Sequence, residues 1–125
     1  MQSELTVITK AKDLCGYILT VTQKSPKNFR YTFVSRVQNL AMDIIENLYR
    51  ANDVFVVRGD AVSCAERLSL QHKAMTNIKL LAYVSQLAME HKCILPKQFE
   101  QISQQATECI RLLGAWINSD RKRLR

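Results

Sequence analysis

Apolar residues spaced alternately three and four positions apart constrain the fold of this chain more than any other feature. Such spacing puts side chains on one face of an α-helix, whereas a half-buried strand requires strict alternation of apolar and polar residues. One run comprises Val34, Val37, Ala41, Ile44, Leu48, Ala51 and Phe55, and another comprises Phe99, Ile102, Ala106, Cys109, Leu113 and Trp116. Broader apolar faces occur in the segment before the first run and in the segment between the two runs. The predicted elements are therefore long amphipathic helices.

Three interruptions divide this pattern into four segments. Pro26 and Pro96 fall where the spacing fails, and proline disrupts a helix interior because it lacks an amide hydrogen. At the interruption between them, Gly59 can end a helix in the left-handed conformation and Asp60 can cap the next one. The predicted helices cover about 4–24, 30–56, 61–92 and 97–119. They form one domain, 1–119, followed by a basic C-terminal tail, 120–125.

Short connections between long amphipathic helices favour antiparallel neighbours, so the expected fold is an all-α, up-down-up-down four-helix bundle. A chain of 125 residues suffices for one hydrophobic core. Further apolar residues lie outside the strict three-and-four runs, which leaves two interpretations open: a second buried surface used in self-association, or an irregular single core. These residues are Phe33, Leu40, Ile110, Leu112 and Ile117.

The cysteines and histidines predict no metal site. Four cysteines, at positions 15, 64, 93 and 109, lie far apart among apolar residues, and no two have the C-x-x-C spacing. We expect reduced thiols in the core, because a free cysteine behaves as a small buried hydrophobe. His72 and His91 add no cluster of ligands.

No catalytic residue is predicted either. The chain has no phosphate-binding glycine loop, nucleophile elbow or H-E-x-x-H motif. Asp43 and Glu46 are three residues apart on one predicted helix, and we expect them on a solvated polar face rather than in a catalytic pair. The expectation is a binding protein without a cofactor, a metal or a small-molecule substrate.

Charge and hydropathy restrict the partners. Eighteen lysines and arginines against eleven acidic residues give a net charge of +7, which favours polyanions, although ordinary surface charge for solubility is an alternative. No apolar run approaches the roughly 20 residues of a membrane-spanning helix. The opening Met1-Gln2-Ser3-Glu4 does not resemble a secretory signal, so we expect a cytoplasmic protein.

The cations gather at two places in the expected bundle. In the up-down order, the two connections that contain the prolines meet at one end of the bundle, together with the cations near them. Glu90 and Glu100 are the acidic residues at the same end. These cations are Lys24, Lys27, Arg30, Arg36, Lys92 and Lys97. The other end receives the tail cations Arg121, Lys122, Arg123 and Arg125. Both sets could neutralise phosphates without reading bases.

Several short segments carry a resemblance through their order and spacing along the chain. The last predicted helix has Leu112-Leu113-Gly114-Ala115-Trp116-Ile117 before the basic tail, and Ile94-Leu95-Pro96-Lys97-Gln98-Phe99 leads into it. The second predicted helix contains Leu48-Tyr49-Arg50-Ala51-Asn52, and the third contains Lys79-Leu80-Leu81-Ala82-Tyr83. In this order, the segments resemble the accessory variability determinant family of diversity-generating retroelements. The related proteins encoded in ribosomal RNA intervening sequences usually carry an Asn-Ile-Ala-Glu-Gly-like segment on the second helix. This chain has Met42-Asp43-Ile44-Ile45-Glu46-Asn47 there, which makes the accessory variability determinant family the better match.

The resemblance implies a homopentameric barrel of bundles that binds a reverse transcriptase and its template RNA or complementary DNA. Such a subunit supports mutagenic cDNA synthesis and is not itself an enzyme. Arg111 and the tail cations would lie near the polymerase or nucleic acid, while Gly114 would allow close helix packing. Leu113, Trp116 and Ile117 would serve core or subunit packing. Two alternatives are a stand-alone bundle of the intervening-sequence type, acting as a structural or interaction module, and a self-assembling protein charged only for solubility.

Overall fold

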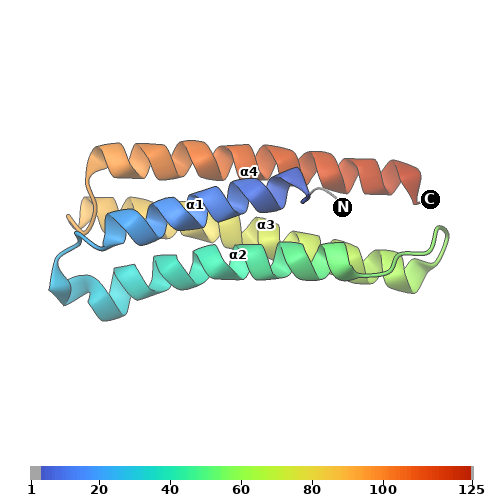
Figure 1. Cartoon of the computed structure of the whole chain (residues 1–125), viewed down its shortest axis with the longest axis horizontal. Helices are drawn as coiled ribbons and strands as arrows, with labels where there is room; N and C mark the ends of the chain where they lie inside the picture. Colours follow the sequence, from blue (N-terminus) through green and yellow to red (C-terminus); the bar gives the residue numbers. More distant parts are fainter. Residues whose placement is uncertain (1–3, 125) are drawn as a thin grey trace.

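Four α-helices account for most of the structure, a computed structural model that describes residues 4–124. They are α1 (Thr6–Thr22), α2 (Ser35–Asp53), α3 (Ala61–Glu90) and α4 (Pro96–Arg123). The helices pack side by side along their lengths, and residues 4–124 contain no strand (Figure 1). The prediction of an all-α four-helix bundle is confirmed.

The loops gather at the two ends of the bundle. The α1–α2 connection and the α3–α4 loop lie together at one end, whereas the α2–α3 loop lies at the other end near the C-terminus (Figure 1). At the first end, the Ser25 hydroxyl donates a hydrogen bond of 2.8 Å to the carbonyl of Cys93. At the second, the amide of Gly59 donates one of 3.3 Å to the carbonyl of Leu124. These contacts join segments that are distant in the sequence.

The helix boundaries at the second and third interruptions along the chain follow from local chemistry. Gly59 has φ +82°, and Oδ2 of Asp60 accepts a hydrogen bond of 3.2 Å from the amide of Ser63 in the first turn of α3. Pro96 is the first residue of α4, where a missing amide hydrogen costs nothing. Asp60 therefore caps α3 and Pro96 begins α4, as predicted, whereas Gly59 does not end α2, which stops at Asp53.

The chain enters α2 through two irregular turns. A 3-10 turn, η1 (Lys27–Phe29), is followed by a π-helical turn, η2 (Arg30–Val34), and α2 continues directly from it. The ring of Phe33 lies 5.7 Å from that of Phe29 and 5.6 Å from that of His91, which follows α3. The irregular turns thus pack against the end of α3.

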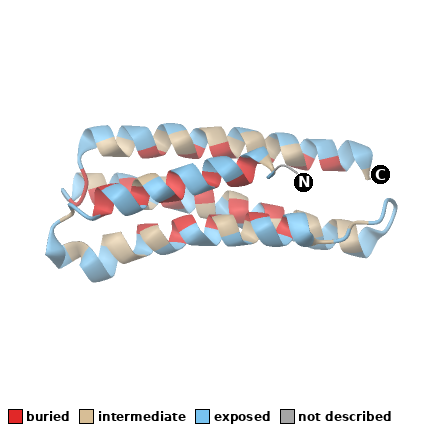
Figure 2. Ribbon diagram, viewed as in Figure 1, coloured by how far each residue is buried: buried red, intermediate tan, exposed pale blue. Residues whose placement is uncertain are grey.

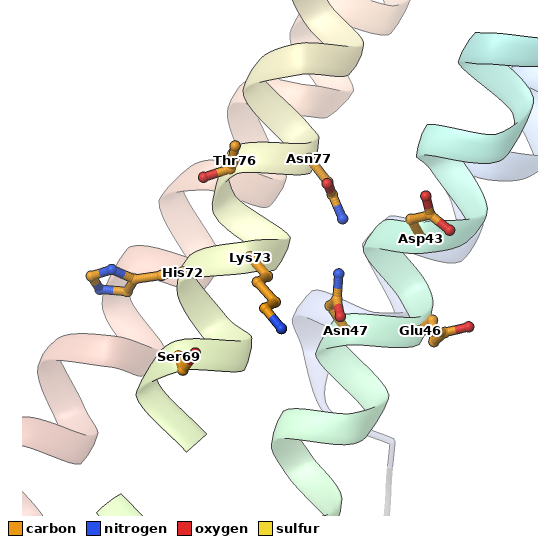
Figure 3. Close-up of a pocket in the computed structure, with 8 residues that line it drawn as sticks. All are labelled: Asp43, Glu46, Asn47, Ser69, His72, Lys73, Thr76 and Asn77. Atoms are coloured by element: carbon orange, nitrogen blue, oxygen red, sulfur yellow. The ribbon is translucent and has the colours of Figure 1, made fainter. Parts of the chain in front are cut away.

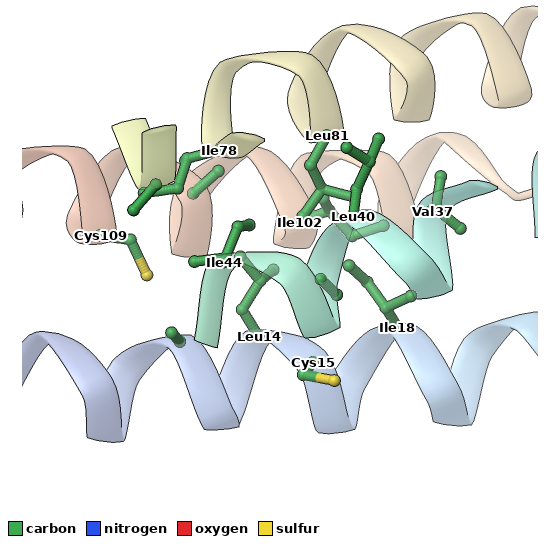
Figure 4. Packing of buried hydrophobic residues seen from close by; sticks show 14 of the residues in the cluster. Leu14, Cys15, Ile18, Val37, Leu40, Ile44, Ile78, Leu81, Ile102 and Cys109 are labelled. Carbon is green, nitrogen blue, oxygen red and sulfur yellow. The ribbon is translucent and has the colours of Figure 1, made fainter. Parts of the chain in front are cut away.

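The core is one stripe of buried side chains contributed by all four helices (Figures 2 and 4). Its largest fully buried apolar members are Leu14, Ile18, Ile44, Leu48, Ile78, Leu81, Ile102 and Leu113. Cys15, Cys93 and Cys109 are buried and unpaired, as predicted, whereas Cys64 is only half-buried. Leu40 and Ile117, assigned outside the strict runs, are also buried. The apolar spacing therefore located most of the core.

The prediction for Phe55 was wrong. Its side chain is 87% exposed, because α2 ends at Asp53 and Val54 has an extended backbone. Val54, Val56 and Val57 are β-branched and therefore poor at continuing a helix. The last member of the predicted run thus left the helix and the core.

The core stripe of α3 includes two polar residues. Gln71 and Ser85 occupy it, although neither was predicted to be buried. Leu68, Met75 and Val84, which are apolar residues of the same helix, are only half-buried at its margin. The apolar spacing did not predict this stripe because two of its positions, Gln71 and Ser85, are polar. The buried members on α3 are Gln71, Ala74, Ile78, Leu81, Ser85 and Ala88.

Candidate nucleic-acid interface

Six cations surround the end of the bundle where the α1–α2 and α3–α4 connections meet, which we call the basic end. All six side chains are exposed, and none joins an ion pair formed within residues 4–124. Exposed Glu90 and Glu100 are the acidic residues beside them. The basic end therefore retains a positive excess, as predicted from the sequence. The cations are Lys24, Lys27, Arg30, Arg36, Lys92 and Lys97.

The backbone of the basic end is held by contacts between its connections. The Ser25–Cys93 hydrogen bond joins the residue after Lys24 to the residue after Lys92. Packing of Phe33 on His91 joins η2, which begins at Arg30, to the end of α3. Cations from separate parts of the sequence are thus kept together.

The second predicted cluster lies on the last turn of α4. The helix continues to Arg123, so the prediction of a tail beginning at 120 was wrong for residues 120–123. Arg121 and Lys122 are exposed, and no ion pair within the described part of the chain involves them. Nη2 of Arg123, in contrast, lies 2.6 Å from Oδ1 of Asp120, and Arg125 lies outside the described residues. The free positive charge of this turn therefore belongs to Arg121 and Lys122.

Asp120 extends α4 because it belongs to a buried polar network that sequence reasoning missed. Its carboxylate is 3.3 Å from Nη1 of Arg67 and accepts a hydrogen bond of 3.0 Å from Gln71. Nη2 of Arg67 also donates to the carbonyl of Val54, and its guanidinium lies 5.7 Å from the centre of the Trp116 ring. The network secures the last turn of α4 to α3 and to the α2–α3 loop. The signal that could have revealed it is the three-and-four spacing, which places Asp120 in register with the core positions of α4.

Arg111 is already engaged. Its guanidinium donates two hydrogen bonds to Glu108, at 3.0 Å from Nε and 2.6 Å from Nη2. These bonds lower the pKa of the Glu108 carboxyl and raise the pKa of the Arg111 guanidinium. A phosphate would have to compete with this carboxylate for Arg111.

The packing residues predicted on α4 have different surroundings. Leu113 and Ile117 are buried in the core, and Trp116 is half-buried against it. Gly114 has no such contact, since apart from its chain neighbours and the adjoining backbone of α4, no atom of the described residues lies within 4 Å of where a β-carbon would stand. Within one chain, a glycine is therefore not required at this position.

An open groove between α2 and α3 contains the carboxylates noted in the sequence. Asp43 and Glu46 are exposed on its α2 side, as expected of a solvated face, and Glu46 forms an ion pair of 3.2 Å with Arg50. His72 points away from α2 (Figure 3). Residues 4–124 contain no group of three or more His, Cys, Asp and Glu side chains placed to hold a metal ion.

No protein-family model matches this chain, and no curated protein sequence matches it. None of the helices in residues 4–124 is both long and apolar enough to cross a lipid bilayer.

Proposed function

We propose that this chain is a non-enzymatic accessory subunit of a diversity-generating retroelement that binds template RNA and the reverse transcriptase. The observation that carries the proposal is the basic end, where six exposed cations from four segments meet beside two carboxylates. Such an array contacts phosphates through charge and counterion release, without reading bases. The sequence resemblance to the accessory variability determinant family supplies the identity of the partners.

The proposal includes an antiparallel up-down-up-down order and a homopentamer. The placement of the loops and the contacts Ser25–Cys93 and Gly59–Leu124 support the helix order. Exposed Met42 and Tyr49 on α2, with Leu80 and Tyr83 on α3, support self-association, because these apolar side chains remain uncovered in one chain. The number five comes from the resemblance.

The two basic clusters suit different contacts. Lys97 and Arg121 lie near opposite ends of α4, and a helix rise of 1.5 Å per residue separates them by roughly 35 Å. In the proposal, the basic end contacts template RNA or cDNA, while the last turn of α4 meets the polymerase or more distant phosphates. The complex works in the cytoplasm and supports mutagenic cDNA synthesis.

RNA binding tests the proposal directly. Fluorescence anisotropy with labelled template RNA would be measured from about 50 to 400 mM salt. Contact with five or six phosphates predicts a slope of roughly −4 in a plot of log binding constant against log salt concentration. Absence of binding at 50 mM salt, or binding insensitive to salt, would contradict the proposal.

Capture of the polymerase provides the second test. A tagged form of the chain should copurify with the reverse transcriptase encoded beside its gene, and that neighbourhood should contain a template and variable repeat pair. A stable oligomer that captures neither polymerase nor RNA would instead identify a structural module of the intervening-sequence type.

A further inference from the structure

Helix α3 ends in a Schellman motif in which a lysine occupies the usual glycine position. The amide of Lys92 donates a hydrogen bond of 3.0 Å to the carbonyl of Met89, and the amide of Cys93 donates one of 2.8 Å to the carbonyl of Ala88. Lys92 has φ +65°, the only positive φ at a non-glycine position within residues 4–124. The backbone is therefore in the left-handed conformation that closes the helix.

Lysine is a costly choice at this position. A β-carbon crowds the backbone in the left-handed conformation, which is why glycine predominates there and asparagine is the usual substitute. The side chain of Lys92 provides no evident compensation, since it is exposed and joins no ion pair formed within the described residues. Glycine at this position would therefore give a more stable helix end than lysine.

Lys92 belongs to a turn that contacts the α1–α2 connection at the basic end. Its neighbour His91 packs on Phe33 of η2, and its neighbour Cys93 accepts the hydrogen bond from Ser25. The turn that carries Lys92 is thereby fixed beside the connection that carries Lys24, Lys27 and Arg30, four residues before the start of α4. The strained lysine thus lies at the same end of the bundle as the other exposed cations of the basic end.

We infer that Lys92 is a phosphate-contacting residue for the sugar-phosphate backbone of a nucleic acid, retained at the cost of a strained helix end. This inference rests on the proposed function and identifies the residue through which the basic end engages its ligand. Strained backbone conformations that persist without benefit to the fold are typical of functional positions. A cation at a fixed turn loses less freedom on binding than one on a mobile segment.

Substitutions of Lys92 separate the charge from the strain. Lys92→Gly should raise the melting temperature by about 2–5 °C, because it relieves the left-handed conformation. The same variant should weaken binding of labelled template RNA about threefold to fivefold at 0.1 M salt and make the salt slope less negative by about 0.7. Lys92→Asn should lose the same affinity, whereas Lys92→Arg should bind within about twofold of the unsubstituted chain.

Lys79→Gln is the matched control, since it removes one exposed cation about three turns before the end of α3. It should leave the affinity within about twofold. If the unsubstituted chain binds RNA and Lys92→Gly binds equally well, the inference is wrong while the proposed function stands. A loss of reverse transcriptase capture without a loss of RNA affinity would also overturn it. If the unsubstituted chain binds no RNA, the proposed function and this inference both fail.

Discussion

Arg67 and Asp120 form an ion pair inside the bundle, with Nη1 of Arg67 3.3 Å from Oδ2 of Asp120. The two side chains are only 13% and 8% exposed. Gln71 and Arg123 also donate to the carboxylate, so three side chains share one acceptor group. The pair joins the middle of the chain to its end and decides that the last basic residues are helical.

Asp120→Asn should destabilise the protein by about 2–4 kcal/mol. The substitution leaves the guanidinium of Arg67 largely buried without a countercharge, and breaking one partner of a buried pair is strongly destabilising. Urea unfolding followed by circular dichroism measures the change in the free energy of unfolding.

The double variant Arg67→Met with Asp120→Asn tests whether the buried charge causes this loss. It removes the uncompensated cation, while the amide introduced at position 120 can still accept the hydrogen bond from Gln71. It should therefore recover at least about 1 kcal/mol relative to Asp120→Asn alone. A double variant no more stable than the single one would show that another effect dominates.

The arginines and lysine on the last turn of α4 should contribute unequally to partner binding. Arg121→Gln with Lys122→Gln removes two exposed, unpaired cations and should weaken binding of template RNA or the polymerase about fivefold to twentyfold at 0.1 M salt. Arg123→Gln should change it less than threefold, because the guanidinium of Arg123 is already held by Asp120 and is less available to a partner. Anisotropy and pull-down measurements at fixed salt give both comparisons.

Replacement of all described tail cations by glutamate, at 121, 122 and 123, should abolish binding at this salt concentration. Circular dichroism spectra should stay helical, which would separate a loss of contact from a loss of fold. Equal affinities for the Arg121/Lys122 and Arg123 variants would contradict the assignment of free charge to the first two.

Gly114→Ala should stabilise the isolated chain by about 0.5–1 kcal/mol. Beyond its own stretch of helix, the new β-carbon has no atom of the described residues within 4 Å, and alanine loses less backbone freedom than glycine in a helix. Urea unfolding at high dilution measures the gain. If Gly114 packs closely against another subunit, the larger Gly114→Leu should lower the oligomer mass seen by light scattering without unfolding the chain.

One cysteine should react rapidly with a thiol reagent in the folded protein. Burial raises the pKa of Cys15 and Cys93, and burial chiefly raises the pKa of Cys109 to about 11. At pH 8 the thiolate fraction of Cys109 is therefore on the order of 0.001, and the thiolate is the reactive form. Cys64 is half-buried near the start of α3 and should react first.

The absorbance of the coloured thiol released from an aromatic disulfide reagent at pH 8 counts the cysteines that react rapidly. Cys64→Ser should remove the single fast phase, and the other three cysteines should react only as the protein unfolds. More than one fast thiol in the folded protein would contradict the core assignment of Cys15, Cys93 or Cys109.

The helices, the interruptions and the basic end could be predicted because their signals are local. Spacings of three and four residues identify helical faces, Pro26, Gly59 and Pro96 mark the interruptions, and short connections bring loop cations to shared ends. The same spacing places Asp120 in register with the core positions of α4, but only the tertiary structure shows the partners that allow Gln71 and Asp120 to be buried.

The sequence by itself determined that the chain forms four helices around one core, since apolar periodicity dictates which faces must leave water. Only the tertiary structure decided which cations remain unpaired, because pairing depends on distance. Asp120 holds Arg123 and Glu108 holds Arg111, while the cations of the basic end form no ion pair within the described residues. The tertiary structure also decided that Lys92 takes a left-handed conformation, because the end of α3 is closed by hydrogen bonds whose geometry the residue type alone would not suggest.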